Sequence, residues 1–523
     1  MKYNNVFKYI FVIVVIVLIL GSVYLVYYKK SSNIESEIDE NDTNQVQQIS
    51  VVENLKMGVQ SFDTLNPILT KNKEIVNIDK LIFEPLVNIT SDYHTENCLA
   101  KEVNKTGDNQ YIIKLDSNIK WQDGANLISK DVQYTIELLK SLDSIYSPNV
   151  SHIQSVDIPD SETAVITLDQ NVPFFEYYLD FPIVSSAYYF NENFANSTKI
   201  PIGTGMYKIA SIDNENILLV TNDRWRKIKD SRPKTQSITI HRYNAIGEMF
   251  NAFKLGNIDI INTQMSNYSD YVGTMGYNKK EYLGRNFTYI SFNCNDSILS
   301  DKAVRKAVCM GINKENIVST LFTGTKSVAN TCLDYGSYLN NSDGVVSYNL
   351  EQAKKELQDS GWTYTGNRWQ KTIDRYARKL ILSVVVNESD QEKVNVANAI
   401  SSQLNEIGIK LNVSKVSPER YYQYLNEKNY QMILTGVDNS VSPDLSYFCG
   451  ENNLANYNNA DVASQITDMD KIKDAQKQVN EDVPYLGLYR NKGYVILNAN
   501  VGGNFTPNSY FTYYNFNEWF RQQ

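Results

Sequence analysis

The chain has 523 residues, a net charge of −9 and 42 % hydrophobic residues. This length allows more than one domain, and the composition is that of a globular protein rather than a disordered or collagen-like one. Acidic and basic residues are spread along the body without a basic stripe, which argues against a nucleic-acid partner.

The N-terminus contains an apolar segment of transmembrane length. Residues 9–28 carry no charge, and about 20 helical residues span the ~30 Å hydrocarbon core of a bilayer. A cleaved signal peptide is the alternative, although its apolar region is usually only about 7–15 residues long. We predict a short cytoplasmic N-terminus at residues 1–8 and a single uncleaved transmembrane anchor at residues 9–28. No cysteine precedes Cys98, so we expect no lipid anchor.

A polar segment follows the anchor. Residues 31–50 include several acidic side chains and no basic one, which is typical of disordered chain. We predict a flexible tether over residues 29–50, and a coil of about 20 residues spans roughly 25 Å. Lysines flank both ends of the apolar segment, so charge alone does not orient the anchor.

The cysteines and histidines point to no metal site. The cysteines are widely spaced without a CxxC pair, so one or two disulfides and a set of free buried thiols remain alternatives. His94, His152 and His241 are isolated from one another and from the cysteines. We expect no metal and no cofactor.

The first part of the body reads as short strands and turns. Residues 111–115 favour a strand, and Asp123-Gly124 favours a tight turn. Ser129 is a candidate N-cap for a helix whose first turn contains Asp131. Gly203-Thr204-Gly205 has no obvious helix behind it and is interpreted as a turn rather than a phosphate loop.

Residues 380–437 predict an α/β unit. Strands are expected at 380–386, 409–416 and 432–437, with helices at 390–407 and after Pro418. Gly408 stands where a C-terminal cap belongs. Such a unit forms a parallel sheet, and ligands bind beyond the carboxyl ends of its strands, which makes 436–443 a candidate ligand loop.

No catalytic motif is present. The phosphate-binding GxxxxGK[ST] loop, the GxSxG elbow, the HExxH helix and the EF-hand spacing are all absent from the sequence. We therefore expect a binding protein and not an enzyme.

Eight short motifs in order resemble the family 5 extracellular solute-binding proteins, which serve oligopeptide, dipeptide and nickel ABC importers. The resemblance runs from about Leu55 to the C-terminus. It includes a segment ending in Leu-Asn-Pro (61–67), a helix of the type yExLv (81–87), and segments 99–103, 120–124, 129–132, 202–207, 301–307 and 353–362.

The resemblance implies an α/β, two-lobed, periplasmic-binding-protein-like fold of type II with an extra small domain. A lower lobe would comprise residues 51–75, 186–285 and 480–523, with the small domain at 76–185 and the upper α/β lobe at 286–479. A ligand would bridge the lobes and stabilise a closed form that docks on a permease.

The resemblance also assigns candidate ligand-binding residues. Tyr289 matches a strand that lines the family's cleft, with packing in the hinge strand as the alternative, and Tyr146 is a further candidate. Peptide-binding members often carry a GWxaDYxdP loop, which here comprises Gly436, Val437, Asp438 and Ser440 among its residues. Val437 replaces the loop's Trp and Ser440 replaces its Asp, so Asp438 is the candidate partner for a peptide amine.

These observations predict a monomeric, membrane-anchored binding protein with its body outside the cytoplasm. We expect it to deliver a peptide or peptide-like solute to an ABC permease and ATPase. The alternative is a tethered ligand sensor or surface peptide chaperone that is not coupled to transport.

Overall fold

The computed structural model describes residues 51–522, except 53, 61, 266, 267, 269–275 and 374. The predicted anchor at 9–28 and the tether at 29–50 lie outside the described residues. Within the part that is described, no helix combines the length and apolar character needed to cross a bilayer. Ser50–Gln523 forms one compact unit.

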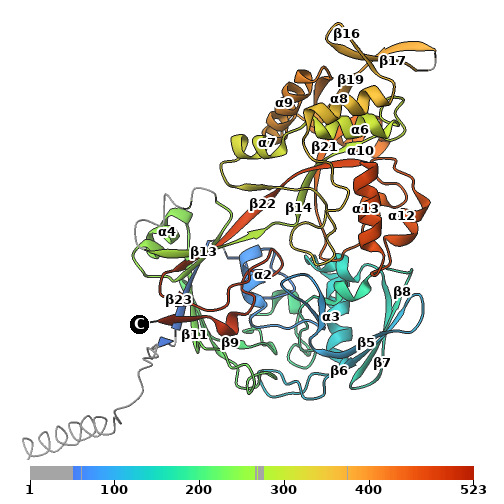
Figure 1. The fold of residues 1–523 in the computed structure, drawn as a ribbon. Helices are drawn as coiled ribbons and strands as arrows, with labels where there is room; N and C mark the ends of the chain where they lie inside the picture. The colour runs from blue at the N-terminus through green and yellow to red at the C-terminus, as the bar shows by residue number, and fades with distance from the viewer. Residues whose placement is uncertain are drawn as a thin grey trace, which may run out of the picture. The chain divides into compact units, whose positions relative to one another are not determined.

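A large mixed sheet runs through this unit (Figure 1). Its strands follow the order β20-β19-β21-β14-β22-β12-β2-β11-β10-β9, and β13 and β15 also pair with β22. Their bounds are β20 Lys410–Val416, β19 Ile381–Asn387, β21 Met432–Asp438, β14 Asn286–Phe292, β22 Tyr485–Asn498, β12 Ile260–Thr263, β2 Asn54–Gln60, β11 Ser237–Tyr243, β10 Asn216–Thr221, β9 Tyr207–Ile212, β13 Tyr277–Leu283 and β15 Lys326–Val328.

Strand β22 connects the two ends of this sheet. Its first residues pair with β14, and its last residues pair with β12 and β13. Figure 1 shows β22 running as one long strand between the part that carries β21 and the part that carries β13. The backbone of β22 is therefore shared by both parts.

The α/β unit predicted at 380–437 is confirmed. Strand β19 pairs in parallel with both β20 and β21, and the connecting helices are α9 (Gln391–Glu406) and α10 (Pro418–Glu427). The Asp390 side chain caps α9, and Gly408 has a positive φ of 80° just after it, as a C-terminal cap requires. Three more helices accompany this unit: α6 Lys302–Met310, α7 Lys314–Leu321 and α8 Leu350–Asp359.

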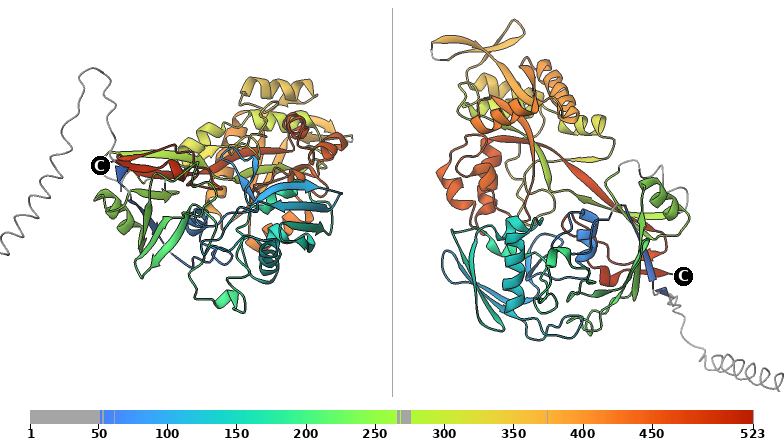
Figure 2. Two further views of the ribbon diagram at one scale, coloured as in Figure 1. Left: turned by 90° about the horizontal axis from the view of Figure 1, so that it is seen from below. Right: turned by 180° about the vertical axis from the view of Figure 1, so that it is seen from behind.

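A separate antiparallel sheet has the order β5-β6-β8-β7 and packs against α3 (Figure 2). The elements are β5 Ala100–Lys105, β6 Gln110–Leu115, β8 Thr163–Leu168, β7 Ile153–Asp160 and α3 Ser129–Ser141. The strand predicted at 111–115 is thus confirmed as β6. The predicted N-cap Ser129 is wrong by one residue, because the cap is Ile128. The Asp131 carboxylate accepts the Ile128 N–H at 3.0 Å, while the Ser129 hydroxyl donates to the Asp160 carbonyl at 2.5 Å.

The helix expected at 81–87 is not formed. Helix α2 (Lys73–Asp79) ends earlier, residues 80–82 form a turn, and Pro85 makes an isolated bridge with Pro182. Proline disfavours helical backbone in the residue before it and lacks the N–H that a helix would use, so the helix ends before this segment.

The remaining elements are small. They are β1 Val51–Val52, β23 Val501–Gly502 and β24 Phe520–Gln522 in one sheet, β16 Thr363–Thr365, β17 Arg368–Ile373 and β18 Tyr376–Lys379 in another, β3 Val87–Ile89 with β4 Thr95–Asn97, and helices α4 Ile246–Lys254, α11 Ser446–Cys449, α12 Ala460–Gln465 and α13 Ile472–Asp482. Of the two alternatives for the cysteines, the structure has the free thiols.

Candidate functional site

Tyr289 lies in a buried aromatic cluster on β14. Its ring stacks on Phe287 with centroids 5.2 Å apart and meets the Phe448 and Tyr485 rings edge to face at 5.5 and 5.9 Å. The side chain is 2 % exposed, and its hydroxyl donates to the hydroxyl of the exposed Tyr447 at 3.3 Å. Burial raises the pKa of Tyr289, so this residue is a neutral phenol that contributes packing and one hydroxyl group.

The predicted ligand loop begins beside Tyr289. In β21, Gly436 and Val437 pair with Thr288 and Phe287 of β14, and Asp438 pairs with Asn286. Gly436, Asp438 and Ser440 are exposed, whereas Val437 packs on the main core. The structure therefore brings Tyr289 and the 436–440 loop together on adjacent strands.

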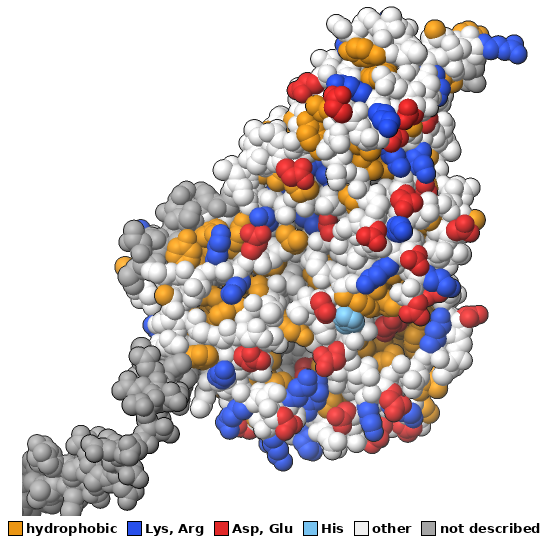
Figure 3. Space-filling view, viewed as in Figure 1, with side chains coloured by type: hydrophobic (Ala, Val, Ile, Leu, Met, Phe, Trp, Pro, Cys, Tyr) orange, Lys and Arg blue, Asp and Glu red, His pale blue; other side chains and the backbone are white. Residues whose placement is uncertain are grey.

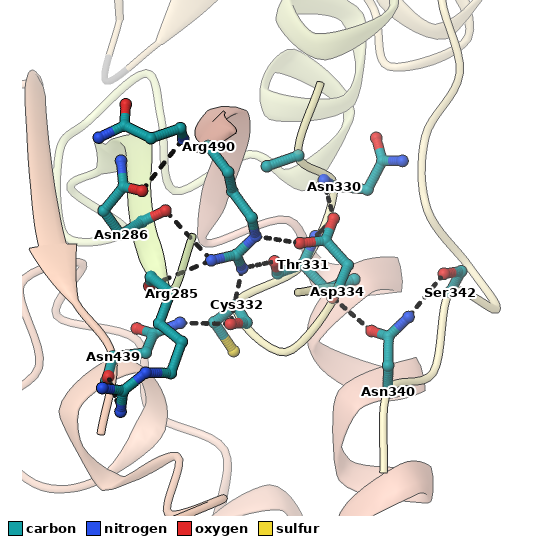
Figure 4. Close-up of polar contacts among 12 residues, drawn as sticks. Arg285, Asn286, Asn330, Thr331, Cys332, Asp334, Asn340, Ser342, Asn439 and Arg490 are labelled. Atoms are coloured by element: carbon teal, nitrogen blue, oxygen red, sulfur yellow. Dashed lines mark hydrogen bonds and ion pairs between the residues drawn. The ribbon is translucent and has the colours of Figure 1, made fainter. Parts of the chain in front are cut away.

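The loop is fixed to the connection between β13 and β14. The Asn439 N–H donates to the Arg285 carbonyl, and the Arg285 guanidinium donates to the Asn439 carbonyl, both at 3.1 Å. The Asn439 amide also donates to the Cys332 carbonyl (Figure 4). These contacts hold the start of the loop against the middle of the large sheet.

Tyr146 lies elsewhere, in a cavity of about 120 Å³. Residue 146 directly precedes the 3₁₀ helix η1 (Ser147–Val150). The cavity is lined by α2, by the chain that follows it and by residues near the C-terminus, and none of its lining residues falls in 286–479. Its wall includes the ionisable side chains Asp79, Lys80, Glu84, Tyr146, Asp180 and Tyr510.

Lys80 and Asp180 carry opposite charges that attract each other in this cavity. The Lys80 ammonium lies over the Tyr510 ring, 2.9 Å from its centroid. Burial lowers the pKa of Lys80, and the Asp180 carboxylate opposes this shift. Burial raises the pKa of Asp180, which also accepts a hydrogen bond from the Asn149 amide at 2.6 Å. The positive charge of Arg285 acts on both residues, so the cavity and the 436–440 loop share an electrostatic neighbour.

Glu84 is held at the opposite side by a different set of groups. One carboxylate oxygen accepts from the Trp225 indole N–H at 3.1 Å and lies 3.5 Å from the Arg226 guanidinium. The same guanidinium lies 3.2 Å from the Cys98 sulfur. Burial raises the pKa of this Cys98 thiol to about 12.

Sequence reasoning did not identify Asp79, Lys80 or Asp180. The one available signal was an adjacent acid and base, Asp79-Lys80, between the apolar residues Ile78 and Leu81. The motif interpretation of 81–87 gave no reason to expect a cavity there. Among the described residues, no group of three or more His, Cys, Asp or Glu side chains is placed to hold a metal ion.

Comparison with known proteins identifies the family. The sequence model of the bacterial extracellular solute-binding proteins, family 5 (Middle), matches residues 94–459. The chain belongs to this family. The sequence resemblance is thereby confirmed, and with it the expectation that the protein is not an enzyme, because a solute-binding protein is a transporter component.

Individual relatives are distant in sequence. The chain is 21 % identical to the oligopeptide-binding protein AppA of Bacillus subtilis over 472 residues, covering 84 % of this chain and 86 % of AppA. It is 24 % identical to a putative ABC transporter peptide-binding protein of Brucella ovis, covering 69 % of each.

Solved structures share the fold. A nickel ABC transporter protein from Bacillus halodurans has a TM-score of 0.75 at 20 % identity, covering 90 % of this chain and 100 % of that one. B. subtilis AppA in complex with a nonapeptide has a TM-score of 0.55 at 20 % identity, covering 91 % and 100 %. These likenesses confirm the two-lobed α/β periplasmic-binding-protein-like fold.

Proposed function

We propose that the chain is the membrane-anchored solute-binding component of an ABC importer and that it captures a peptide or peptide-like solute. Family membership supports the transport role. The names of relatives, which include an oligopeptide-binding protein and peptide-binding proteins, favour a peptide over another solute. The permease and ATPase of the importer are the partners that this role requires.

The observation that carries the proposal is the junction between β14, β21 and β22. Strand β22 is shared by both ends of the large sheet, and β14 pairs with it where the exposed 436–440 loop begins. Gly436 and Asp438 are exposed and lie beyond the residues of β21 that pair with β19, so an extended peptide can add to this edge of β21. We assign ligand contacts to Tyr289 through its hydroxyl and to Gly436, Val437, Asp438 and Ser440, with Tyr146 contributing from the cavity.

The same sheets support a division of the body into lobes. We propose a lower lobe of residues 51–75, 186–285 and 480–523, a small domain at 76–185 that contains the β5–β8 sheet, and an upper lobe at 286–479 that contains the α/β unit. A ligand that contacts both lobes favours the closed form, since it has more partners there. The apolar segment 9–28 and the polar segment 29–50 would anchor a monomeric body outside the cytoplasm.

Thermal unfolding of the full chain in detergent micelles tests the solute class. We expect a mixed pool of short peptides to raise the Tm, because a ligand at 100 times its Kd stabilises the folded state by about 2.7 kcal/mol. Nickel ions and nickel–histidine are the comparison solutes, since some structural relatives are nickel proteins. A Tm that rises with nickel–histidine and not with any peptide would contradict the peptide assignment.

A second measurement separates transport from sensing. We expect the full chain to co-purify with a permease from mildly solubilised membranes and to stimulate ATP hydrolysis by the importer when peptide is added. Peptide binding with a kinase or other regulator in place of the permease would instead support the tethered sensor.

A further inference from the structure

Asp79 is a buried acid without a partner. It is the last residue of α2, its side chain lines the 120 Å³ cavity, and it is 4 % exposed. Neither of its carboxylate oxygens has a hydrogen-bond partner in the described part of the chain. A buried carboxylate with neither a hydrogen-bond donor nor a cation beside it is strongly unfavourable, so an ordinary core seldom retains one.

The charged groups around Asp79 leave it without a cation of its own. Lys80 interacts electrostatically with Asp180, and Arg226 forms an ion pair with Glu84, whereas the charge that acts on Asp79 is the negative one of Asp63. Glu84 also has one carboxylate oxygen without a partner in the same cavity. The remaining titratable groups that face this space are Glu96, Cys98, Tyr146, Lys227 and Tyr510.

We propose that the cavity binds a cationic group of the imported solute, an ammonium or guanidinium, with the Asp79 carboxylate as its direct partner. A hydrogen bond between two ionised groups is among the strongest in proteins. Tyr146 and Tyr510 also line the cavity, and the Lys80 ammonium over the Tyr510 ring shows that an aromatic side chain accepts a cation there. The proposal rests on the proposed function only for the identity of the molecule that carries the cation.

The loop at 436–440 offers no buried anionic partner for a cation. Ser440 cannot form an ion pair, and Asp438 is exposed, so water weakens its attraction for a cation. The cation could be a peptide's amino terminus or a basic side chain, and both have the chemistry that Asp79 requires. A cavity of about 120 Å³ holds one such group and not a whole peptide.

Binding should be linked to protons. Burial raises the pKa of Asp79 well above its ordinary value, so the empty cavity favours the neutral carboxylic acid over the carboxylate. An arriving ammonium favours the carboxylate, and the Asp79 proton passes to the solvent as the ion pair forms. Affinity for the cation should therefore rise with pH, with proton release measurable by calorimetry in buffers of different ionisation enthalpy.

The test compares n-butylammonium with the neutral 1-butanol, at millimolar concentration, on the full chain in detergent. We expect only the cation to raise the Tm. Asp79→Asn should reduce its affinity by roughly 10- to 100-fold and abolish the proton release, since a hydrogen bond to a charged group contributes about 1.5–3 kcal/mol. Asp79→Asn should also fold, because no hydrogen bond is lost. Asp108→Asn, the same acid-to-amide exchange at an exposed residue that does not line the cavity, is the matched control and should bind the cation as wild type does.

Lys80→Met should change the affinity for the cation in the opposite direction to Asp79→Asn. Removing the cavity's own cation should tighten n-butylammonium binding, whereas mere damage to the cavity would weaken it. Equal Tm shifts with butylammonium and butanol, or equal cation affinity in wild type and Asp79→Asn, would overturn the proposal.

Peptides then identify the source of the cation. Ala-Ala-Ala is compared with N-acetyl-Ala-Ala-Ala, and N-acetyl-Ala-Arg-Ala with its norvaline analogue. A preference that Asp79→Asn removes supports the cavity and assigns it to the amino terminus or to the basic side chain. Peptide binding that is indifferent to charge in both pairs would overturn the inference and leave the proposed function standing. Cation binding without binding of any peptide would support the cation site and contradict the proposed peptide function.

Discussion

The guanidinium of Arg490 in β22 donates to the carboxylate of Asp334 (Figure 4). Arg490 is fully buried, and its remaining N–H groups donate to the backbone carbonyls of Arg285, Asn286, Thr331 and Cys332 at 2.6–3.2 Å. One side chain thus joins β22 to the β13–β14 connection and to the 330–334 segment. The β13–β14 connection also binds Asn439 of the 436–440 loop. The Arg490–Asp334 ion pair therefore stabilises the backbone on which the candidate site is built.

Arg490→Met should destabilise the protein by about 3–5 kcal/mol, because it leaves the mostly buried Asp334 carboxylate without its cation and four backbone carbonyls without their donor. Denaturant unfolding of the full chain in detergent measures the change. The matched control is Arg232→Met, which removes a surface ion pair to Asp223 with both side chains more than half exposed. That variant should lose no more than about 1 kcal/mol. Equal losses in the two variants would contradict the assigned role of Arg490.

Gly203→Ala should also destabilise the protein. A Cβ atom at Gly203 would lie 2.0 Å from the Ile82 carbonyl oxygen, and backbone cannot move away as a side chain can. Overpacking of this kind costs about 1–3 kcal/mol or more. Gly107→Ala is the control, since a Cβ there meets nothing within 4 Å. The free energy of unfolding distinguishes them, and a Gly203→Ala variant as stable as Gly107→Ala would show that the two backbones separate readily.

The space-filling view (Figure 3) has acidic and basic side chains interspersed over the face that it displays, as the sequence composition suggested.

Local structure was predictable wherever one sequence pattern dominated. Strand β19 is largely apolar, β20 begins with alternating polar and apolar residues, and Asp390 and Gly408 cap the helix between them, so the α/β unit was found to within a residue or two. At 81–87 a family motif suggested a helix. No helix forms there, because Pro85 restricts the backbone.

The cavity could not be predicted, for a physical reason. Asp79 and Asp180 are about a hundred positions apart, and neither belongs to a spaced motif. They line one cavity only because the chain after α2 packs against the segment that follows η2 (Phe175–Leu179). Tyr289 was found by its strand, yet its burial among Phe287, Phe448 and Tyr485 depends on long-range packing.

Stability should fall as the pH rises from about 4.5 to 7 because of Glu74. Burial raises the pKa of Glu74 to about 7 from its ordinary 4.5, so the folded state retains a proton that the unfolded state releases. The contribution of Glu74 to stability is therefore largest below pH 4.5 and is lost through this window. Glu74→Gln should flatten the pH dependence of the unfolding free energy, since its amide oxygen can still accept the Gln60 N–H. Glu248→Gln, in the first turn of α4 and exposed, is the control and should leave the slope as in wild type. An unchanged slope in Glu74→Gln would contradict the assignment.

Tyr289→Phe separates packing from binding at the candidate site. The ring and its contacts with Phe287 and Phe448 are retained, and the lost hydroxyl bond to Tyr447 should cost about 0.5–1.5 kcal/mol of stability. If the Tyr289 hydroxyl also contacts the solute, Tyr289→Phe should increase the Kd roughly three- to tenfold for the peptides that raise the Tm of the wild type. Tyr289→Ala should lose about 3–5 kcal/mol, because it empties a fully packed position. Tyr447→Phe removes the other hydroxyl of the pair and is the matched variant, so titration calorimetry of both locates the group that the ligand uses. Wild-type affinity in Tyr289→Phe would leave this residue a packing role alone, with peptide contacts confined to the exposed loop at 436–440.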